Sequence, residues 1–305
     1  MTERVREILS WYGSDNPGTL TNLARILNHG KLGGTGKLVI LPVDQGFEHG
    51  PLRTFLPNPA GFNPRYHVEF AIESGCNAYA APLGAIEAIA RDYAGDIPLI
   101  LKGNNHDILQ DEADPTQALT GTPEDAIRLG CVGVGYTIYP GSEHRFEMYE
   151  TIRAQLEVAK SYGLATIIWS YPRGTGISKE GEVGFDVCAY AAQIACQLGA
   201  HIVKVKLPSA HVEFEPNKKA IEKSKIKYDT LAERVSYIVK SCFDGRRMVI
   251  FSGGAMVSSE EIIADAKAIQ AGGGFGSIMG RNSFQRPKAE GLELLSQVMK
   301  IYASK

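Results

Sequence analysis

The sequence alternates short apolar runs with longer stretches of helical period, and this pattern repeats eight times. Runs rich in Val, Ile and Leu predict buried parallel strands, and the stretches between them predict crossover helices. The eight expected strands span 37–44, 76–81, 98–102, 131–138, 165–171, 201–207, 248–253 and 275–280. Because no G-x-G-x-x-G turn follows the first of them, the pattern favours an α/β fold of the (β/α)8 TIM-barrel type over an open doubly wound sheet.

Start and stop signals bound the expected helices. These helices span about 63–74, 84–94, 122–129, 143–162, 183–198, 228–243, 258–271 and 287–302. Thr122 and Ser258 each offer a capping side chain followed by acids, which stabilise the positive end of a helix. Gly75 and Gly163 each stand between a helix and the next strand, where a left-handed residue ends a helix most easily. The recurring order of strand, helix and glycine supports a closed barrel.

We expect a single domain over residues 1–305, because one barrel commonly accounts for a chain of this length. Residues 1–30 predict two helices that precede the barrel and close its lower end. Residues 208–227 are the longest polar connection and are expected to form a long loop after the sixth strand. A loop of this length next to a barrel mouth is typical of an active-site cover.

Composition argues against several other classes of protein. The net charge of −2 leaves no basic excess for a nucleic-acid binder. No apolar run reaches the length of a membrane span, and the first residues carry charges in place of an apolar signal core. Five cysteines without paired spacing are typical of free thiols in a reducing compartment. We therefore expect a cytoplasmic protein that binds neither nucleic acid nor membranes.

The sixth expected strand carries two lysines on one side. Side chains alternate along a strand, so Lys204 and Lys206 point into the barrel and the valines beside them face the helices. A lysine in an apolar pocket beside a second cation has a lowered pKa and can attack a ketone as the neutral amine. The imine that forms is an electron sink for carbon–carbon cleavage. The spacing alone does not decide which lysine reacts, and phosphate binding by either is an alternative.

The fifth expected strand ends in two aromatic residues on one side, Trp169 and Tyr171, with Arg173 just beyond them. A tyrosine in a lysine-rich site can transfer protons, because cations lower the cost of forming the phenolate. The alternative interpretation is an aromatic layer of the barrel followed by a proline turn.

The loops after the last two strands predict a phosphate site. Barrels often bind phosphate there, through glycine backbone amides and a short helix N-terminus. Glycine permits the close backbone approach, and an arginine adds a charge-assisted fork. The residues expected to form this site are Ser252, Gly253, Gly254, Gly280 and Arg281.

The first expected strand delivers an acid, Asp44, to the same end of the barrel. Such an acid can orient a substrate hydroxyl or assist proton transfer, although Asp is also a common turn former. Glu48 and His49 follow it, but the seven histidines are scattered and show no metal-ligand spacing. We therefore expect neither a metal nor a cofactor.

Together these segments resemble the archaeal-type class I fructose-1,6-bisphosphate aldolases, a Schiff-base family with a bacterial branch. The matching segments run in the family's order over most of the chain: VDQGFEHGP (43–51), WSYPRG (169–174), HIVKVK (201–206), FSGG (251–254) and GGFGSIMGRNSFQR (273–286). The resemblance implies a lyase that reversibly cleaves fructose 1,6-bisphosphate to dihydroxyacetone phosphate and glyceraldehyde 3-phosphate, in glycolysis and gluconeogenesis.

The resemblance also implies roles for single residues. Lys204 would form the Schiff base with C2, Tyr171 would transfer protons and Trp169 would shape the wall. Asp44 would act on a substrate hydroxyl. The phosphate beside the ketone would be held by Ser252, Gly253, Gly254, Gly280 and Arg281, and the distal phosphate by Arg173 or Lys102. Many relatives are homo-oligomers, some of them decamers, so the resemblance implies an oligomer.

Two alternatives stay open. A related Schiff-base aldolase, transaldolase or thiolase would use the same lysine on another ketose phosphate, and the long 208–227 connection bears on that choice. The other alternative is a barrel that binds a sugar phosphate without any chemistry.

Overall fold

Eight parallel strands close into a barrel in the computed structural model, which describes residues 1–109, 113–253 and 256–304. Around the barrel the order is β1-β10-β9-β8-β7-β6-β3-β2. The strands are β1 (Leu38–Pro42), β2 (Ala78–Pro82), β3 (Leu99–Lys102), β6 (Gly133–Ile138), β7 (Ala165–Ser170), β8 (Ile202–Lys206), β9 (Met248–Ser252) and β10 (Gly276–Ile278). Each overlaps one of the eight expected strands, which confirms the (β/α)8 barrel.

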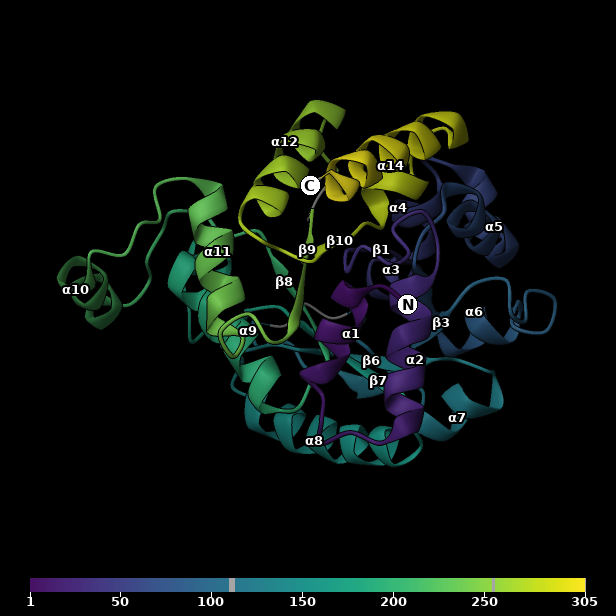
Figure 1. Ribbon diagram of the computed structural model, residues 1–305, viewed down its shortest axis with the longest axis horizontal. Coiled ribbons are helices and arrows are strands. Elements are labelled where there is room, and N and C mark those ends of the chain that lie inside the picture. The colour runs from purple at the N-terminus through teal and green to yellow at the C-terminus, as the bar shows by residue number, and fades with distance from the viewer. Residues whose placement is uncertain (110–112, 254–255, 305) are drawn as a thin grey trace.

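A ring of helices surrounds the strands (Figure 1). They are α5 (Pro64–Ser74), α6 (Leu83–Glu87), α7 (Pro123–Arg128), α8 (Arg145–Ser161), α9 (Phe185–Gln197), α11 (Leu231–Ser241), α12 (Ser259–Ala271) and α14 (Lys288–Ala303). Only α6 departs much from expectation. It ends at Glu87, and the following residues form turns. One of these turns is closed by a hydrogen bond from Ile89 N–H to Ile86 O at 3.0 Å.

Local signals start and stop these helices as expected. Thr122 and Ser258 each form a capping box with the acid three residues on, which satisfies two backbone donors at each helix start. Gly75 ends α5 with φ at 79°, and Gly163 follows α8 with φ at 77°. Both angles lie in the left-handed region, which glycine enters without steric cost.

Two further helices, α1 (Glu3–Ser10) and α2 (Pro17–Asn28), precede the barrel and lie across one end of it (Figure 1). Their apolar faces, including Val5, Ile8 and Leu23, share a core with inward-facing strand residues. The Tyr12 hydroxyl donates to the backbone oxygen of His201 at 2.7 Å, just before β8 begins. These helices therefore cover the end where the strands start and leave the opposite mouth for function.

Several short elements lie in the connections that leave the strands at that mouth. They are α3 (Gln45–Glu48), α4 (Pro51–Phe55) and η1 (Pro59–Phe62) after β1, β4 (Asn104–Asn105) and β5 (Ala118–Leu119) after β3, η2 (Gly181–Val183) after β7, α10 (Glu215–Ser224) after β8 and α13 (Arg281–Phe284) after β10. Residues 208–227, expected as a loop, thus contain a helix, α10. Pro216 lies in its first turn, and α10 stands away from the barrel (Figure 1). Within the described ranges, no helix is long and apolar enough to cross a bilayer.

Candidate active site

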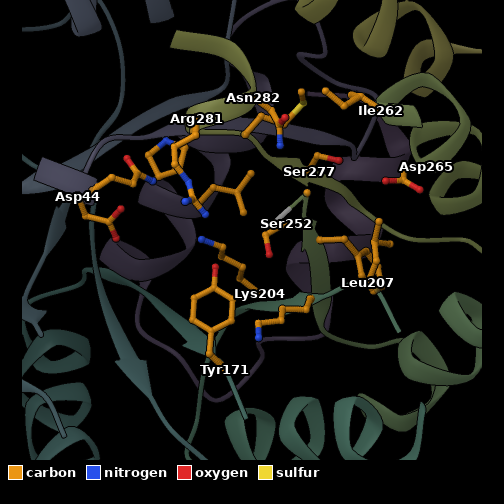
Figure 2. Close-up of a pocket in the computed structure, with 18 of the residues that line it drawn as sticks. Asp44, Tyr171, Lys204, Leu207, Ser252, Ile262, Asp265, Ser277, Arg281 and Asn282 are labelled. Carbon is orange, nitrogen blue, oxygen red and sulfur yellow. The ribbon is translucent and has the colours of Figure 1, made fainter. Parts of the chain in front are cut away.

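A cavity opens where β1, β7, β8, β9 and β10 end, and most of the expected site residues line it (Figure 2). These lining residues are Asp44, Tyr171, Arg173, Lys204, Ser252, Gly253, Gly280 and Arg281. Trp169 and Lys102 lie behind the cavity wall, both 1% exposed. Gly254 lies outside the described residues. The barrel therefore brings together side chains that are up to 237 positions apart in the chain, from Asp44 to Arg281.

Lys204 projects from β8 into the cavity, as strand alternation predicted, and is 5% exposed. Its Nζ lies 4.9 Å from the centroid of the Tyr171 ring and 5.7 Å from that of Trp169. Burial lowers the pKa of the Lys204 amine to about 8; Asp44 and Glu48 oppose this shift. About a tenth of the amine is then neutral at pH 7, which makes it available for attack on a ketone.

The second cation that acts on Lys204 is Arg281, which also lowers the lysine's pKa. Lys206, expected in that role, lies nearer the rim of the cavity, where its Nζ is 3.2 Å from Glu182 Oε2. Glu182 belongs to η2, in the loop after β7, so the pair links this loop to the end of β8. Sequence spacing indicated that both lysines face inward, but it gave no sign of this partner.

Tyr171 points toward the Lys204 amine from the loop after β7 (Figure 2). Burial raises the pKa of its phenol, although a hydrogen bond with Ser252 and the charge of Arg173 act in the opposite direction. The Arg173 cation lowers the cost of forming the phenolate, in the direction expected from the sequence, but the effect of desolvation is larger. Tyr171 is therefore a neutral phenol and can donate a proton.

Trp169 fills the space beneath Lys204, and a glycine on the neighbouring strand makes this possible. Gly135 lies in β6, where an added Cβ would be only 1.6 Å from Trp169 Cζ3 and 1.9 Å from Cη2. A glycine inside a strand often marks such a close approach. Sequence reasoning gave Gly135 no role, although its place within the expected strand 131–138 was the available signal.

Asp44 directly precedes α3, and Glu48 ends this short helix, with its backbone N–H donating to Asp44 O at 3.1 Å. Both carboxylates line the cavity. Burial raises the pKa of Glu48, and Asp44 adds to that rise while Lys102 opposes it. From the sequence, Glu48 was considered only as a metal ligand beside His49; its spacing of four residues from Asp44 was the signal that the two share a helical turn.

The opposite wall carries the expected phosphate residues. An added Cβ on Gly280 would be 2.6 Å from Gln45 Nε2 and 3.0 Å from Pro42 O, so a larger residue would have to displace the Gln45 side chain. A Cβ added at Gly253 would lie 3.1 Å from Asn282 Nδ2, which is also a close contact. Arg281 supplies the positive charge of this wall; burial and the charge of Arg53 lower its pKa, and Tyr171, Asp44 and Glu48 oppose that shift.

Because burial leaves part of the Lys204 amine neutral and Tyr171 lies beside it, this barrel mouth can form an imine with a ketone, and the fold and site define a Schiff-base barrel enzyme. Sequence comparison identifies the family within this class. The chain belongs to the DeoC/LacD family of aldolases, whose model matches residues 38–286.

Named relatives agree with this family. The chain is 36% identical over 301 residues to a probable class 1 fructose-bisphosphate aldolase of Chlamydia muridarum, with 94% of this chain and 85% of that protein covered. It is 33% identical over 255 residues to the class 1 fructose-bisphosphate aldolase of Thermoproteus tenax, covering 83% and 86%. Its fold is similar to an archaeal fructose-1,6-bisphosphate aldolase solved with the catalytic lysine bound to the carbinolamine intermediate, with a TM-score of 0.75, 29% identity and coverage of 92% and 98%.

Proposed function

We propose that this chain is a class I fructose-bisphosphate aldolase, a lyase that reversibly cleaves fructose 1,6-bisphosphate into dihydroxyacetone phosphate and glyceraldehyde 3-phosphate. The observation that carries the proposal is the buried Lys204 amine, 4.9 Å from the Tyr171 ring and facing a wall that contains Arg281. The two class 1 aldolases at 33–36% identity support the same reaction and the same covalent chemistry.

The reaction begins when the neutral Lys204 amine attacks C2 of the open-chain ketose and forms a carbinolamine. Proton transfer to its hydroxyl releases water and leaves a protonated imine. Tyr171 is the donor for this step, since burial keeps its phenol protonated. The phenolate that results is stabilised by its neighbours Ser252 and Arg173.

Bond cleavage uses the same groups in reverse. Tyr171, now the phenolate, takes the proton of the C4 hydroxyl, the C3–C4 bond breaks, and its electron pair moves into the imine as an enamine. Glyceraldehyde 3-phosphate leaves; protonation of C3 and hydrolysis of the imine then release dihydroxyacetone phosphate and restore Lys204. Asp44 orients the substrate hydroxyls, and Trp169 supports the lysine from below.

The two phosphates fix the substrate across the cavity. We assign the phosphate next to the ketone to the wall that contains Ser252, Gly253, Gly280 and Arg281. Gly254, which lies outside the described residues, is assigned to the same phosphate from the sequence resemblance alone. The distal phosphate is assigned to Arg173, which lines the cavity on the β7 side, with its Cζ 5.2 Å from the Tyr139 ring centroid.

We place the protein in the cytoplasm, in glycolysis and gluconeogenesis, as a homo-oligomer that needs no cofactor. Light scattering coupled to size-exclusion chromatography gives the oligomer's mass, and a mass equal to one 33.1 kDa chain would contradict this part.

Borohydride trapping with dihydroxyacetone phosphate, followed by peptide mass mapping, tests the reaction. We expect a reduced adduct on Lys204, which Lys204→Met abolishes together with turnover, while Lys206→Met keeps the adduct. An adduct on Lys206 would move the reactive amine, and no adduct despite measured ligand binding would refute the Schiff-base mechanism. Fructose 1-phosphate should be cleaved far more slowly than the bisphosphate; equal rates, or a preference for another ketose phosphate, would contradict the proposed substrate.

A further inference from the structure

We propose that Lys102 is a positioning residue that holds Glu48 in the cavity as a second carboxylate beside Lys204. This role differs from the phosphate contact that the sequence suggested for Lys102. It rests on the proposed function, because it concerns how the reactive amine is tuned for imine formation.

The surroundings of Lys102 use all the N–H donors of its ammonium group, so none is left to bind a substrate. Lys102 is 1% exposed and does not line the cavity. Its Nζ lies 3.3 Å from Glu48 Oε1 and also donates to the backbone oxygen and, at 3.4 Å, to the Oδ1 of Asn104. Three acceptors match the three N–H donors of a lysine, so the group is fully used inside the protein.

The residue that receives Lys102 is itself held rigidly. Asn104 Nδ2 donates to Thr137 O at 2.8 Å, and Thr137 N–H donates to Asn104 Oδ1 at 2.7 Å. The Asn104 side-chain amide thus both donates to and accepts from the backbone of one residue in β6, and these two hydrogen bonds fix its orientation. Lys102 therefore has a defined direction, toward Glu48, because its other acceptors cannot swing away.

Glu48 connects this buried network to the reaction. It ends α3, whose first turn begins at Asp44, and both carboxylates line the cavity. An isolated buried carboxylate is costly and would take up a proton, so a fixed counter-ion is needed to keep it charged. Lys102 supplies this counter-ion from outside the cavity, which leaves the inner side of Glu48 to act on Lys204.

The charge on Glu48 affects Lys204 in a definite direction. Glu48 and Asp44 both raise the pKa of the Lys204 amine against the effect of burial. Lys102 favours the ionised Glu48 carboxylate, so losing Lys102 would raise the pKa of Glu48, shift it toward the protonated form and thereby lower the pKa of Lys204. The titratable and charged groups that line the cavity around Lys204 are Asp44, Glu48, His49, Tyr171, Arg173, Lys206, Asp265 and Arg281.

The pH dependence of borohydride trapping with dihydroxyacetone phosphate measures this effect, since only the neutral amine attacks. For the unaltered protein we expect the trapping rate to rise through pH of about 8. Glu48→Gln should lower the midpoint by about one pH unit, as expected for removal of one partly buried charge near the amine. Dihydroxyacetone phosphate lacks the distal phosphate, so loss of a distal contact cannot produce the shift.

Lys102→Met separates the proposed role from the alternatives. We expect it to move the midpoint in the same direction as Glu48→Gln, and we expect the double variant to shift no further than Glu48→Gln alone. A cation that acted directly on Lys204 would give the opposite result, since its removal would raise the midpoint. An unchanged midpoint with a raised KM for fructose 1,6-bisphosphate would show instead that Lys102 binds the distal phosphate.

Two checks keep the interpretation clear. Glu73→Gln removes a carboxylate from a surface pair with Lys288, at 2.6 Å, and should leave the midpoint unchanged. If the unaltered protein forms no adduct on Lys204, the proposed function fails. If it forms the adduct while neither Glu48→Gln nor Lys102→Met moves the midpoint, only the positioning role fails.

Discussion

Replacing Gly135 by alanine tests how the wall behind Lys204 is built. The new methyl group would lie 1.6, 1.9 and 2.9 Å from three carbons of the Trp169 ring, whereas ordinary contacts begin near 3.4 Å. The ring edge must therefore retreat by about 2 Å, because β6 is paired at Gly135 with Lys102 on one side and Ile167 on the other. The strand itself has no freedom to move away.

The magnitude follows from this displacement. Overpacking a buried site costs about 1–3 kcal/mol, and we expect the upper part of that range because the ring is 1% exposed. Alanine in a strand interior regains about 0.5–1 kcal/mol over glycine, so the net loss of unfolding free energy should be about 2 kcal/mol. Since Trp169 lies 5.7 Å from Lys204 Nζ, moving it should also slow imine trapping, by roughly 100-fold for a misplacement of this size.

Urea unfolding followed by tryptophan fluorescence gives the stability change, and the trapping rate on Lys204 gives the effect on chemistry. Gly84→Ala is a matched control, because an added Cβ in α6 meets no atom within 4 Å. We expect that control to be neutral or slightly stabilising. If Gly135→Ala unfolds within about 0.5 kcal/mol of the unaltered protein and traps at the same rate, the close packing of Trp169 against Gly135 is refuted.

Three further changes have defined outcomes. Tyr171→Phe should reduce turnover by about 10²–10⁴-fold while borohydride still traps an adduct on Lys204, and undiminished turnover would remove the tyrosine from proton transfer. Burial lowers the pKa of His67 to about 4, so the folded protein favours the neutral imidazole. This preference adds about 3 kcal/mol to the free energy of unfolding above pH 6.5, relative to low pH, and is lost as the pH falls toward 4. Urea unfolding at pH 7 and pH 4 should show that the free energy of unfolding drops less for His67→Gln than for the unaltered protein. Equal drops would contradict this role of His67. Thr230→Ala removes a capping box from α11 and should cost about 1 kcal/mol in a thermal unfolding series.

Periodicity carried most of the fold prediction. The strands were identifiable because strands buried on both faces read as continuous apolar runs, and the inward direction of Lys204 followed from alternation within β8. The position of α10 was missed because its polar sequence contributes a single buried residue, Ile221, so its helical period carries little apolar signal.

The site was less predictable where it depends on partners from other strands. Spacing showed that Lys206 faces inward, but its partner Glu182 comes from the loop after the preceding strand, β7. Likewise, the ionic partner of Lys102 lies 54 positions away, and nothing local indicates it. The pKa of Tyr171 could not be judged from its charged neighbours, since its depth of burial is a property of the assembled barrel.

The two helices that cover the floor of the barrel also set an order of assembly. The bond from the Tyr12 hydroxyl to His201 joins groups separated by 189 positions. At synthesis rates of about 5–20 residues per second, roughly 10–40 seconds pass between the translation of these two residues. During that interval the apolar faces of α1 and α2 have no β8 against which to settle. The earliest part of this sequence to be made is therefore among the last to reach its final place.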